Sequence, residues 1–235
     1  MNIGIILAGG SGTRMGNQSK PKQFIDVYGK PLIIYTLEAF ENNEYIDEIV
    51  ISCHKDWIDN VKIWCRKYEI TKVKYIVEGG NTRQESSYNA LKCLDKELSD
   101  DDIVVIHDSA RPLITPQIIK NNVIMSKEYD AVDTVIHSDD TVIRSIDDKR
   151  IESVPTRKEL YLGQTPQSFK YSLIKNAHIE AEKNGIYNAT DDCQLVLKLN
   201  KQVFLVDGDK LNLKITRSED LTLFKAILKM GRIGG

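Results

Sequence analysis

The chain of 235 residues is 41% hydrophobic and 28% charged; at about 150 residues per domain, this predicts one large domain or one domain with an appendage and excludes a disordered or fibrous protein. Lys and Arg number 32 against 34 Asp and Glu, a net charge of -2, so a protein that coats nucleic acid is disfavoured. No apolar run approaches the roughly 20 residues that span a bilayer, and no targeting signal precedes the first apolar run, so a cytoplasmic protein without membrane contact is expected.

Short β-branched runs alternate with longer segments of helical periodicity along most of the chain. Strands are expected at 3–7, 48–53, 73–77, 103–106 and 131–136. Helices are expected at about 31–40, 57–68, 83–98 and 116–129. Repeated strand–helix units with nearly continuous apolar strands predict an α/β fold, with a mostly parallel sheet and helices on both of its faces.

This alternation stops at residues 137–166, where 141–144 and 150–154 are expected to form short strands around a turn. We interpret the segment as an inserted β-arm within a single domain of residues 1–235. Because the arm is too small for a core of its own, it must pack on its own sheet or on a neighbouring subunit. Beyond it, the remaining elements are expected at about 170–184 (helix), 203–206 and 213–215 (strands) and 218–230 (helix).

The first strand leads into a glycine-rich loop, Leu7-Ala8-Gly9-Gly10-Ser11-Gly12-Thr13-Arg14-Met15-Gly16, with Pro21-Lys22 following. Glycines allow successive backbone N–H groups to face an anion, and ligands bind beyond the carboxyl ends of such strands. The spacing matches neither the dinucleotide motif nor the P-loop. Arg14 and Lys22 add two cations, which suits a nucleoside triphosphate whose leaving pyrophosphate gains charge, whereas Lys20 is expected to point to solvent. A flexible hinge with surface cations is the alternative interpretation.

Two further strands end in polar clusters. The loop from Gly79 to Ser86 could approach a nucleotide base closely, although a glycine turn before a helix explains it equally well. The 103–106 strand leads to His107 and Asp108, and a carboxylate at that place suits Mg2+, which needs only one or two protein oxygens. His107 is expected to be a packing residue and not a general base. Two interpretations of Arg111 stay open: it is either a site residue or a structural ion-pair partner.

Later in the chain, three segments contain residues suited to bind phosphate. Arg157 offers a planar fork and Thr165 a hydroxyl, although both are also ordinary loop residues. Thr190 begins a Thr-Asp-Asp run whose default role is helix capping. Lys214 lies between apolar residues and either reaches solvent or meets an anion. The four cysteines lie far apart, without metal-finger spacing, and reduced thiols are expected.

In their order and spacing, these motifs resemble the bacterial CTP-dependent polyol-phosphate cytidylyltransferases. The resemblance covers essentially the whole chain and implies a Rossmann-like sheet of the nucleotide-diphospho-sugar transferase type. The family acts on ribitol 5-phosphate or on 2-C-methyl-D-erythritol 4-phosphate, and Ser109 with residues 130–135 and 163–167 looks more like the ribitol branch. The implied reaction is transfer of CMP from CTP to ribitol 5-phosphate, giving CDP-ribitol and pyrophosphate.

The resemblance also implies residue roles. Arg14 and Lys22 would stabilise the transition state, and Arg157 and Lys214 would position the acceptor phosphate, with Thr141, Thr165 and Thr190 nearby. Mg2+ is the implied cofactor, with Asp108 as its ligand, and the β-arm implies a homodimer in which Arg157 reaches a partner's site. The residues implied to bind CTP are Leu7, Ala8, Gly9, Gly10, Gly80, Asn81, Thr82, Arg83, Ser86, Asp108 and Ser109.

This chemistry needs no general base, because a phosphate monoester has its second pKa near 6 and is largely dianionic at pH 7. We therefore expect ordered use of CTP with Mg2+. The alternatives are the erythritol-phosphate enzyme, a sugar-1-phosphate nucleotidyltransferase using UTP or dTTP, a GT-A-like glycosyltransferase and a non-catalytic nucleotide-binding regulator. For the last two, residues 100–102 would be the candidate acidic metal motif, but they precede a strand and so lie at the wrong edge of the sheet.

Overall fold

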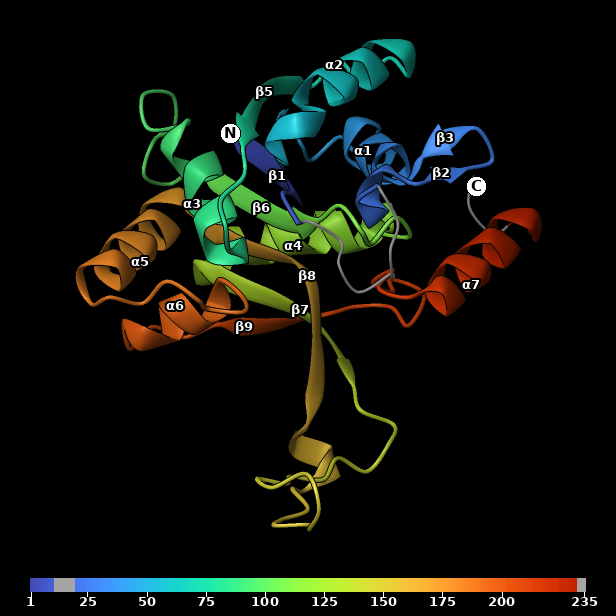
Figure 1. The fold of residues 1–235 in the computed structure, drawn as a ribbon. Helices are drawn as coiled ribbons and strands as arrows, with labels where there is room; N and C mark the ends of the chain where they lie inside the picture. Colours follow the sequence, from blue (N-terminus) through green and yellow to red (C-terminus); the bar gives the residue numbers. More distant parts are fainter. Residues whose placement is uncertain (11–19, 232–235) are drawn as a thin grey trace.

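A seven-stranded sheet lies at the centre of the molecule, in the order β5-β4-β1-β6-β8-β7-β9 (Figure 1). The structure is a computed structural model that describes residues 1–10 and 20–231. The strands of the sheet are β1 (Asn2–Ala8), β4 (Glu48–Cys53), β5 (Val73–Glu78), β6 (Ile103–Asp108), β7 (Ala131–His137), β8 (Tyr161–Lys170) and β9 (Phe204–Asp207). Neighbouring strands run parallel except at β8, which is antiparallel to both β6 and β7. The mostly parallel sheet expected from the sequence is confirmed.

Helices cover both faces of this sheet, which explains why its strands are apolar on both sides. One face carries α1 (Leu32–Glu41), α2 (Ile58–Lys67) and α4 (Pro116–Tyr129), and the other carries α3 (Arg83–Lys92), α5 (Tyr171–Lys183) and α6 (Cys193–Lys198). The side chains of β1 alternate between the two cores: Ile6 and Ala8 join the first, and Ile3 and Ile5 the second. The sheet is therefore held rigidly from both sides.

A smaller apolar cluster joins the C-terminal helix α7 (Ser218–Lys229) to the hairpin formed by β2 (Asp26–Val27) and β3 (Lys30–Pro31). Ile215 is buried in this cluster, and its backbone N–H donates to the carbonyl oxygen of Ala110 at 2.8 Å. The cluster thereby fixes the chain next to Lys214. Among the described residues there are also three short 3-10 helices: η2 (Lys22–Phe24), η3 (Lys55–Trp57) and η4 (Arg157–Glu159).

The β-arm projects away from the sheet between β7 and β8 (Figure 1). The short strands expected at 141–144 and 150–154 were wrong: their pairing is a single bridge between Arg144 and Ser153. Residues 161–166 belong to β8, and the first residues of this strand pair with the end of β7 to form the stem of the arm (Figure 1). Ile143, Ile146 and Ile151 in the arm are each more than half exposed. The two apolar runs thus stay largely exposed and do not pair as a regular hairpin.

Several element boundaries also differ from expectation. The α3 helix ends at Lys92, and turns replace its expected continuation to residue 98. The expected strand at 213–215 is an extended segment attached through Ile215 and not a sheet strand. All four cysteines, which lie in the described part of the chain, are unpaired. Among residues 1–10 and 20–231, no helix has the length and apolar character needed to cross a membrane.

Candidate active site

Loops at the carboxyl ends of β1, β5 and β6 surround a cavity of about 560 Å³. Every residue that was expected to bind CTP contributes to its lining, and so do Lys22 and Lys214. The lining consists of Leu7, Ala8, Gly9, Gly10, Lys22, Gln23, His54, Gly80, Asn81, Thr82, Arg83, Ser86, Asp108, Ser109, Ala110 and Lys214. A second cavity, of about 790 Å³, lies between α2 and β5 and contains none of the predicted site residues.

Two glycine loops touch each other at the floor of the 560 Å³ cavity. A Cβ on Gly79 would lie 2.9 Å from the Cα of Gly9, and a Cβ on Gly9 would lie 2.9 Å from Ser86 Oγ. Real Cβ atoms do not approach other atoms so closely, so any side chain at either position would force the loops apart. The two loops therefore pack directly on each other beside the cavity, and glycine allows this close backbone approach.

Hydrogen bonds hold the second loop rigid. Thr82 caps α3 by accepting from the Glu85 N–H at 3.0 Å. Ser86 Oγ accepts from the Gly80 N–H at 3.0 Å and donates to the Thr82 carbonyl at 2.9 Å. The Asn81 N–H donates to Glu85 Oε2 at 2.7 Å. These contacts order the loop before any ligand binds, which lowers the entropic cost of binding.

Gln23 was missed by the sequence analysis, yet it ties the first loop together. Its side chain is 2% exposed, and Nε2 donates to the carbonyls of Ala8 at 2.8 Å and Gly10 at 2.7 Å. Because both partners are acceptors, the amide can face them only with its nitrogen. The next residue, Phe24, is buried and stacks on Trp57 at 4.8 Å. Lys22 thus precedes two anchored side chains. A polar residue beside an apolar one in Pro21-Lys22-Gln23-Phe24 was the available signal.

Lys20 and Arg14 are the other two cations that the sequence analysis singled out near the first loop. Lys20 does not simply extend into solvent as expected, because its Nζ lies over the rings of Trp57 at 5.2 Å and Trp64 at 5.4 Å. Cation–π attraction accounts for that placement. Arg14 lies outside the described residues.

Asp108 ends β6 and faces the cavity with its carboxylate paired. Lys214 Nζ lies 2.7 Å from Oδ2, and Arg83 Nε lies 3.7 Å from Oδ1. Burial alone would raise the pKa of Asp108, but Lys214 and Arg83 outweigh burial and hold this pKa well below its ordinary value. The carboxylate is therefore ionised at neutral pH.

His107 has no free ring nitrogen, which agrees with the expected packing role. Nδ1 contacts Thr165 Oγ1 at 3.0 Å, and Nε2 contacts the Arg111 carbonyl at 3.1 Å. Burial lowers the pKa of His107 to about 4, so the ring is neutral at pH 7. The same Thr165 hydroxyl accepts from the Asp108 N–H at 3.2 Å, so Thr165 is buried in this chain of contacts and holds β8 against β6. Arg111 Nη1 donates to the Asn212 carbonyl at 2.7 Å.

The residues expected at the acceptor are not all gathered at the cavity. Lys214 reaches it, because Asn212 Nδ2 donates to the Thr165 carbonyl at 2.8 Å and holds that segment against β8. Arg157 lies in the arm, where Nη1 donates to the Asp139 carbonyl at 3.3 Å, and Thr141 is exposed in the same arm. Thr190 is exposed and accepts from Gln194 Nε2 at 2.7 Å.

Comparisons with known proteins agree with a nucleotide-binding site at this cavity. Residues 3–230 match the family model described as IspD: 2-C-methyl-D-erythritol 4-phosphate cytidylyltransferase. The chain belongs to this family. The ribitol-5-phosphate cytidylyltransferase of Streptococcus agalactiae serotype III (strain NEM316) is 38% identical over 227 residues, 97% of this chain and 95% of that protein. The protein of that name from S. agalactiae serotype V is also 38% identical, over the same shares.

Solved structures of the IspD family share the fold along nearly the whole chain. The 4-diphosphocytidyl-2C-methyl-D-erythritol synthase of Anaerococcus prevotii DSM 20548 is 30% identical with a TM-score of 0.82, over 97% of this chain and 96% of that one. The 2-C-methyl-D-erythritol 4-phosphate cytidylyltransferase of Thermus thermophilus is 26% identical with a TM-score of 0.75, over 97% and 100%. This chain is thus a cytidylyltransferase-family enzyme with the IspD-type nucleotidyltransferase fold.

Proposed function

We propose that the protein transfers CMP from CTP to ribitol 5-phosphate, giving CDP-ribitol and pyrophosphate. The observation that carries the CTP part is one cavity lined by glycines of two loops, by residues of the ordered 80–86 loop, and by Lys22 and Lys214. The acceptor is chosen because relatives 38% identical over 97% of the chain are named ribitol-5-phosphate cytidylyltransferases. The solved structures named for the erythritol substrate are 30% identical or less.

The reaction is an in-line substitution at the α-phosphorus of CTP. An oxygen of the acceptor phosphate forms a bond to that phosphorus, the bond to the α–β bridging oxygen breaks, and pyrophosphate leaves with the electron pair. Lys22, together with Arg14, stabilises the charge that builds on the transition state. Lys214, together with Arg157, orients the acceptor phosphate. No side chain has to remove a proton from the dianionic acceptor, which is consistent with a His107 whose two nitrogens are occupied.

Mg2+ is the cofactor in this proposal, with Asp108 as its protein ligand. The described residues contain no group of three or more His, Cys, Asp or Glu that could hold a metal. A lone carboxylate nevertheless suits Mg2+, which keeps several waters and takes further oxygens from substrate phosphates. Asp108 meets this need because it is ionised and lines the nucleotide cavity. When bound, the ion would neutralise charge on the phosphates.

Pyrophosphate release tests this proposal. The enzyme is assayed with CTP or UTP against ribitol 5-phosphate and 2-C-methyl-D-erythritol 4-phosphate, each with and without Mg2+. We expect CTP with ribitol 5-phosphate to give the highest kcat/KM, at least tenfold above the other pairs. Preference for the erythritol substrate would show that the protein is a 2-C-methyl-D-erythritol 4-phosphate cytidylyltransferase instead. Binding of CTP without pyrophosphate release from either acceptor would favour a regulator.

A homodimer joined through the β-arm belongs to the same proposal. The arm exposes apolar side chains that no part of the described chain covers, with Ile146 at 73% and Ile151 at 62% exposed. Arg157 lies in this arm and not at the cavity of its own chain, so in a dimer it would serve the partner's site.

Charges placed on the arm should therefore dissociate the protein. We expect the double substitution Ile146→Asp, Ile151→Asp to give a monomer by sedimentation velocity and to lose acceptor turnover, because burying two carboxylates in an apolar interface is costly. Leu223→Asp is the control, since Leu223 is 50% exposed on α7. A double variant that stays dimeric, or a wild-type protein that is monomeric, would rule out the arm interface.

A further inference from the structure

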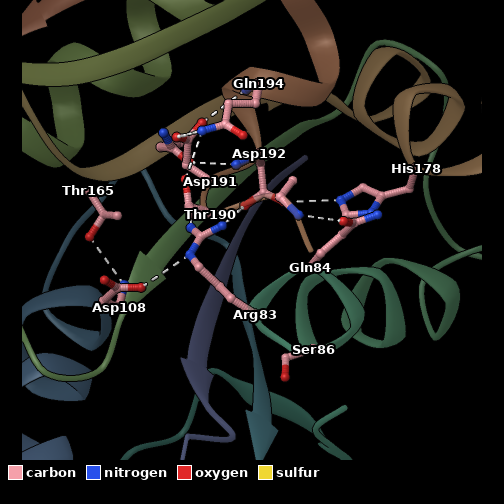
Figure 2. Close-up of polar contacts among 12 residues, drawn as sticks. Arg83, Gln84, Ser86, Asp108, Thr165, His178, Thr190, Asp191, Asp192 and Gln194 are labelled. Carbon is pink, nitrogen blue, oxygen red and sulfur yellow. Dashed lines mark hydrogen bonds and ion pairs between the residues drawn. The ribbon is translucent and has the colours of Figure 1, made fainter. Parts of the chain in front are cut away.

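The segment from residue 186 to residue 192 is fastened to the first turn of α3, at the edge of the nucleotide cavity. Gln84 holds it by two backbone contacts: Nε2 donates to the Ile186 carbonyl at 2.6 Å, and Oε1 accepts from the Ala189 N–H at 2.9 Å. Arg83 holds its other end, with Nη1 2.6 Å from Asp192 Oδ2. Figure 2 shows Arg83 lying between Asp192 on this segment and Asp108 on β6.

The carboxylate of Asp192 is built into the interior. Its side chain is 1% exposed, and Oδ1 accepts from His178 Nε2 at 3.0 Å while Oδ2 accepts from Arg83. The ring of His178 stacks on Tyr88 at 5.2 Å, which fixes its plane. Burial alone would raise the pKa of Asp192, but Arg83 and His178 hold this pKa well below its ordinary value.

The Thr-Asp-Asp run predicted a helix cap, but capping does not explain the position of the Asp192 side chain. The cap of α6 is made by the neighbouring Asp191, whose Oδ1 accepts from the Gln194 N–H at 2.9 Å. The Asp192 side chain makes no cap hydrogen bond and points to Arg83 instead. One of the two adjacent carboxylates thus serves its own helix, and the other serves a residue of the nucleotide cavity.

Resting on the proposed binding of CTP, we infer that Asp192 is a positioning residue, which acts on the nucleotide through the orientation of Arg83. The guanidinium has two acids within reach, at 2.6 Å (Asp192) and 3.7 Å (Asp108). The closer contact keeps Nη1 on the buried Asp192 carboxylate, so Arg83 faces Asp108 only through Nε at 3.7 Å. Without that contact the guanidinium turns onto Asp108, and both residues leave the geometry that the nucleotide needs.

A double-mutant cycle on CTP affinity tests this inference, with affinity measured by isothermal titration calorimetry without acceptor. The variants are Asp192→Asn, Arg83→Gln and the double variant. We expect each single substitution to weaken CTP binding about tenfold, the size of one lost charge-assisted hydrogen bond, and the double variant to be no weaker than Arg83→Gln alone. In steady state, Asp192→Asn should raise the KM for CTP and keep kcat within about threefold.

Two further substitutions separate positioning from support of the fold. Asp191→Asn removes the adjacent charge and keeps a capping side chain, so it should leave CTP affinity within about twofold. His178→Leu removes a donor to Asp192 without touching Arg83; it should weaken CTP binding about threefold in the wild-type background and not at all with Arg83→Gln. This second cycle decides the matter if Asp192→Asn does not fold.

The outcomes distinguish this inference from the function on which it rests. Losses that add in the double variant, or an unchanged CTP affinity in a folded Asp192→Asn variant, would show that Asp192 is only structural, and the enzyme would still be a cytidylyltransferase. A wild-type protein that does not bind CTP would overturn the proposed function itself. Non-additive losses with the control unaffected would establish the positioning role.

Discussion

Lys22→Ala is expected to lower kcat by about 100-fold or more, with a smaller change in the KM for CTP. Removing one preorganised donor to a transition-state charge typically costs this much, because the donor acts mainly on charge that develops as the bond breaks. Lys22 lines the cavity, and the anchored side chains of Gln23 and Phe24 follow it directly, so an ammonium here is held close to where the triphosphate would lie. Stopped-flow or steady-state pyrophosphate release measures the loss.

Lys20→Ala is the matched control, since it removes a lysine two residues away from the same segment. Its ammonium sits on the two indoles and not in the cavity, so kcat should stay within about threefold. Thermal melting should show both variants folded. If His107→Gln abolished turnover while Lys22→Ala was nearly unaffected, general-base chemistry would replace the electrostatic mechanism proposed here.

The strands and the location of the site were predictable because both follow from local rules. Buried parallel strands must be apolar on both faces, so runs such as residues 103–106 were visible in the sequence. The loops after β1, β5 and β6 then had to lie at one edge of the sheet, where the structure places their side chains around one cavity.

Strand β8 was not predicted, because its middle looks like a loop. Residues 164–168 carry Gln, Thr, Pro, Gln and Ser, yet all of them are buried in the sheet. Their polar groups are satisfied by residues distant in sequence: Ser168 Oγ donates to Asn122 Oδ1 at 3.0 Å, and Gln167 Nε2 donates to Asp133 Oδ1 at 3.0 Å. Composition alone does not reveal such partners, which exist only after the strands have assembled.

The supporting residues of the site were missed for a related reason. Gln23 and Asp192 act through side-chain directions that tertiary packing decides, so the sequence around them does not show which groups they contact. Arg157 and Thr141 lie in an arm away from the cavity, although the resemblance to a family grouped them with Lys214. A role for them at the acceptor requires a second copy of the chain, which the sequence of one chain does not supply.

Lys214→Met is expected to lower kcat/KM for the acceptor by about 100-fold while the dissociation constant of CTP changes much less. The methionine keeps the apolar stem and removes the ammonium, so the buried segment around Asn212 and Ile215 keeps its packing. Without the ammonium the acceptor phosphate loses a point of attachment, and misplacing an attacking atom by about 1 Å can cost 100-fold in rate. Asp108 keeps Arg83 as a partner, which limits the loss of stability.

Lys210→Met provides the comparison, because Lys210 lies four residues earlier and pairs with Asp139 at the exposed base of the arm. Its acceptor kinetics should match the wild type. Varying ribitol 5-phosphate at saturating CTP measures kcat and KM for the acceptor, and calorimetry measures CTP binding. A Lys214→Met variant that loses CTP binding and keeps its acceptor KM would place Lys214 on the nucleotide, in which case its contact with Asp108 would be part of the triphosphate site and the acceptor phosphate would depend on the arm alone.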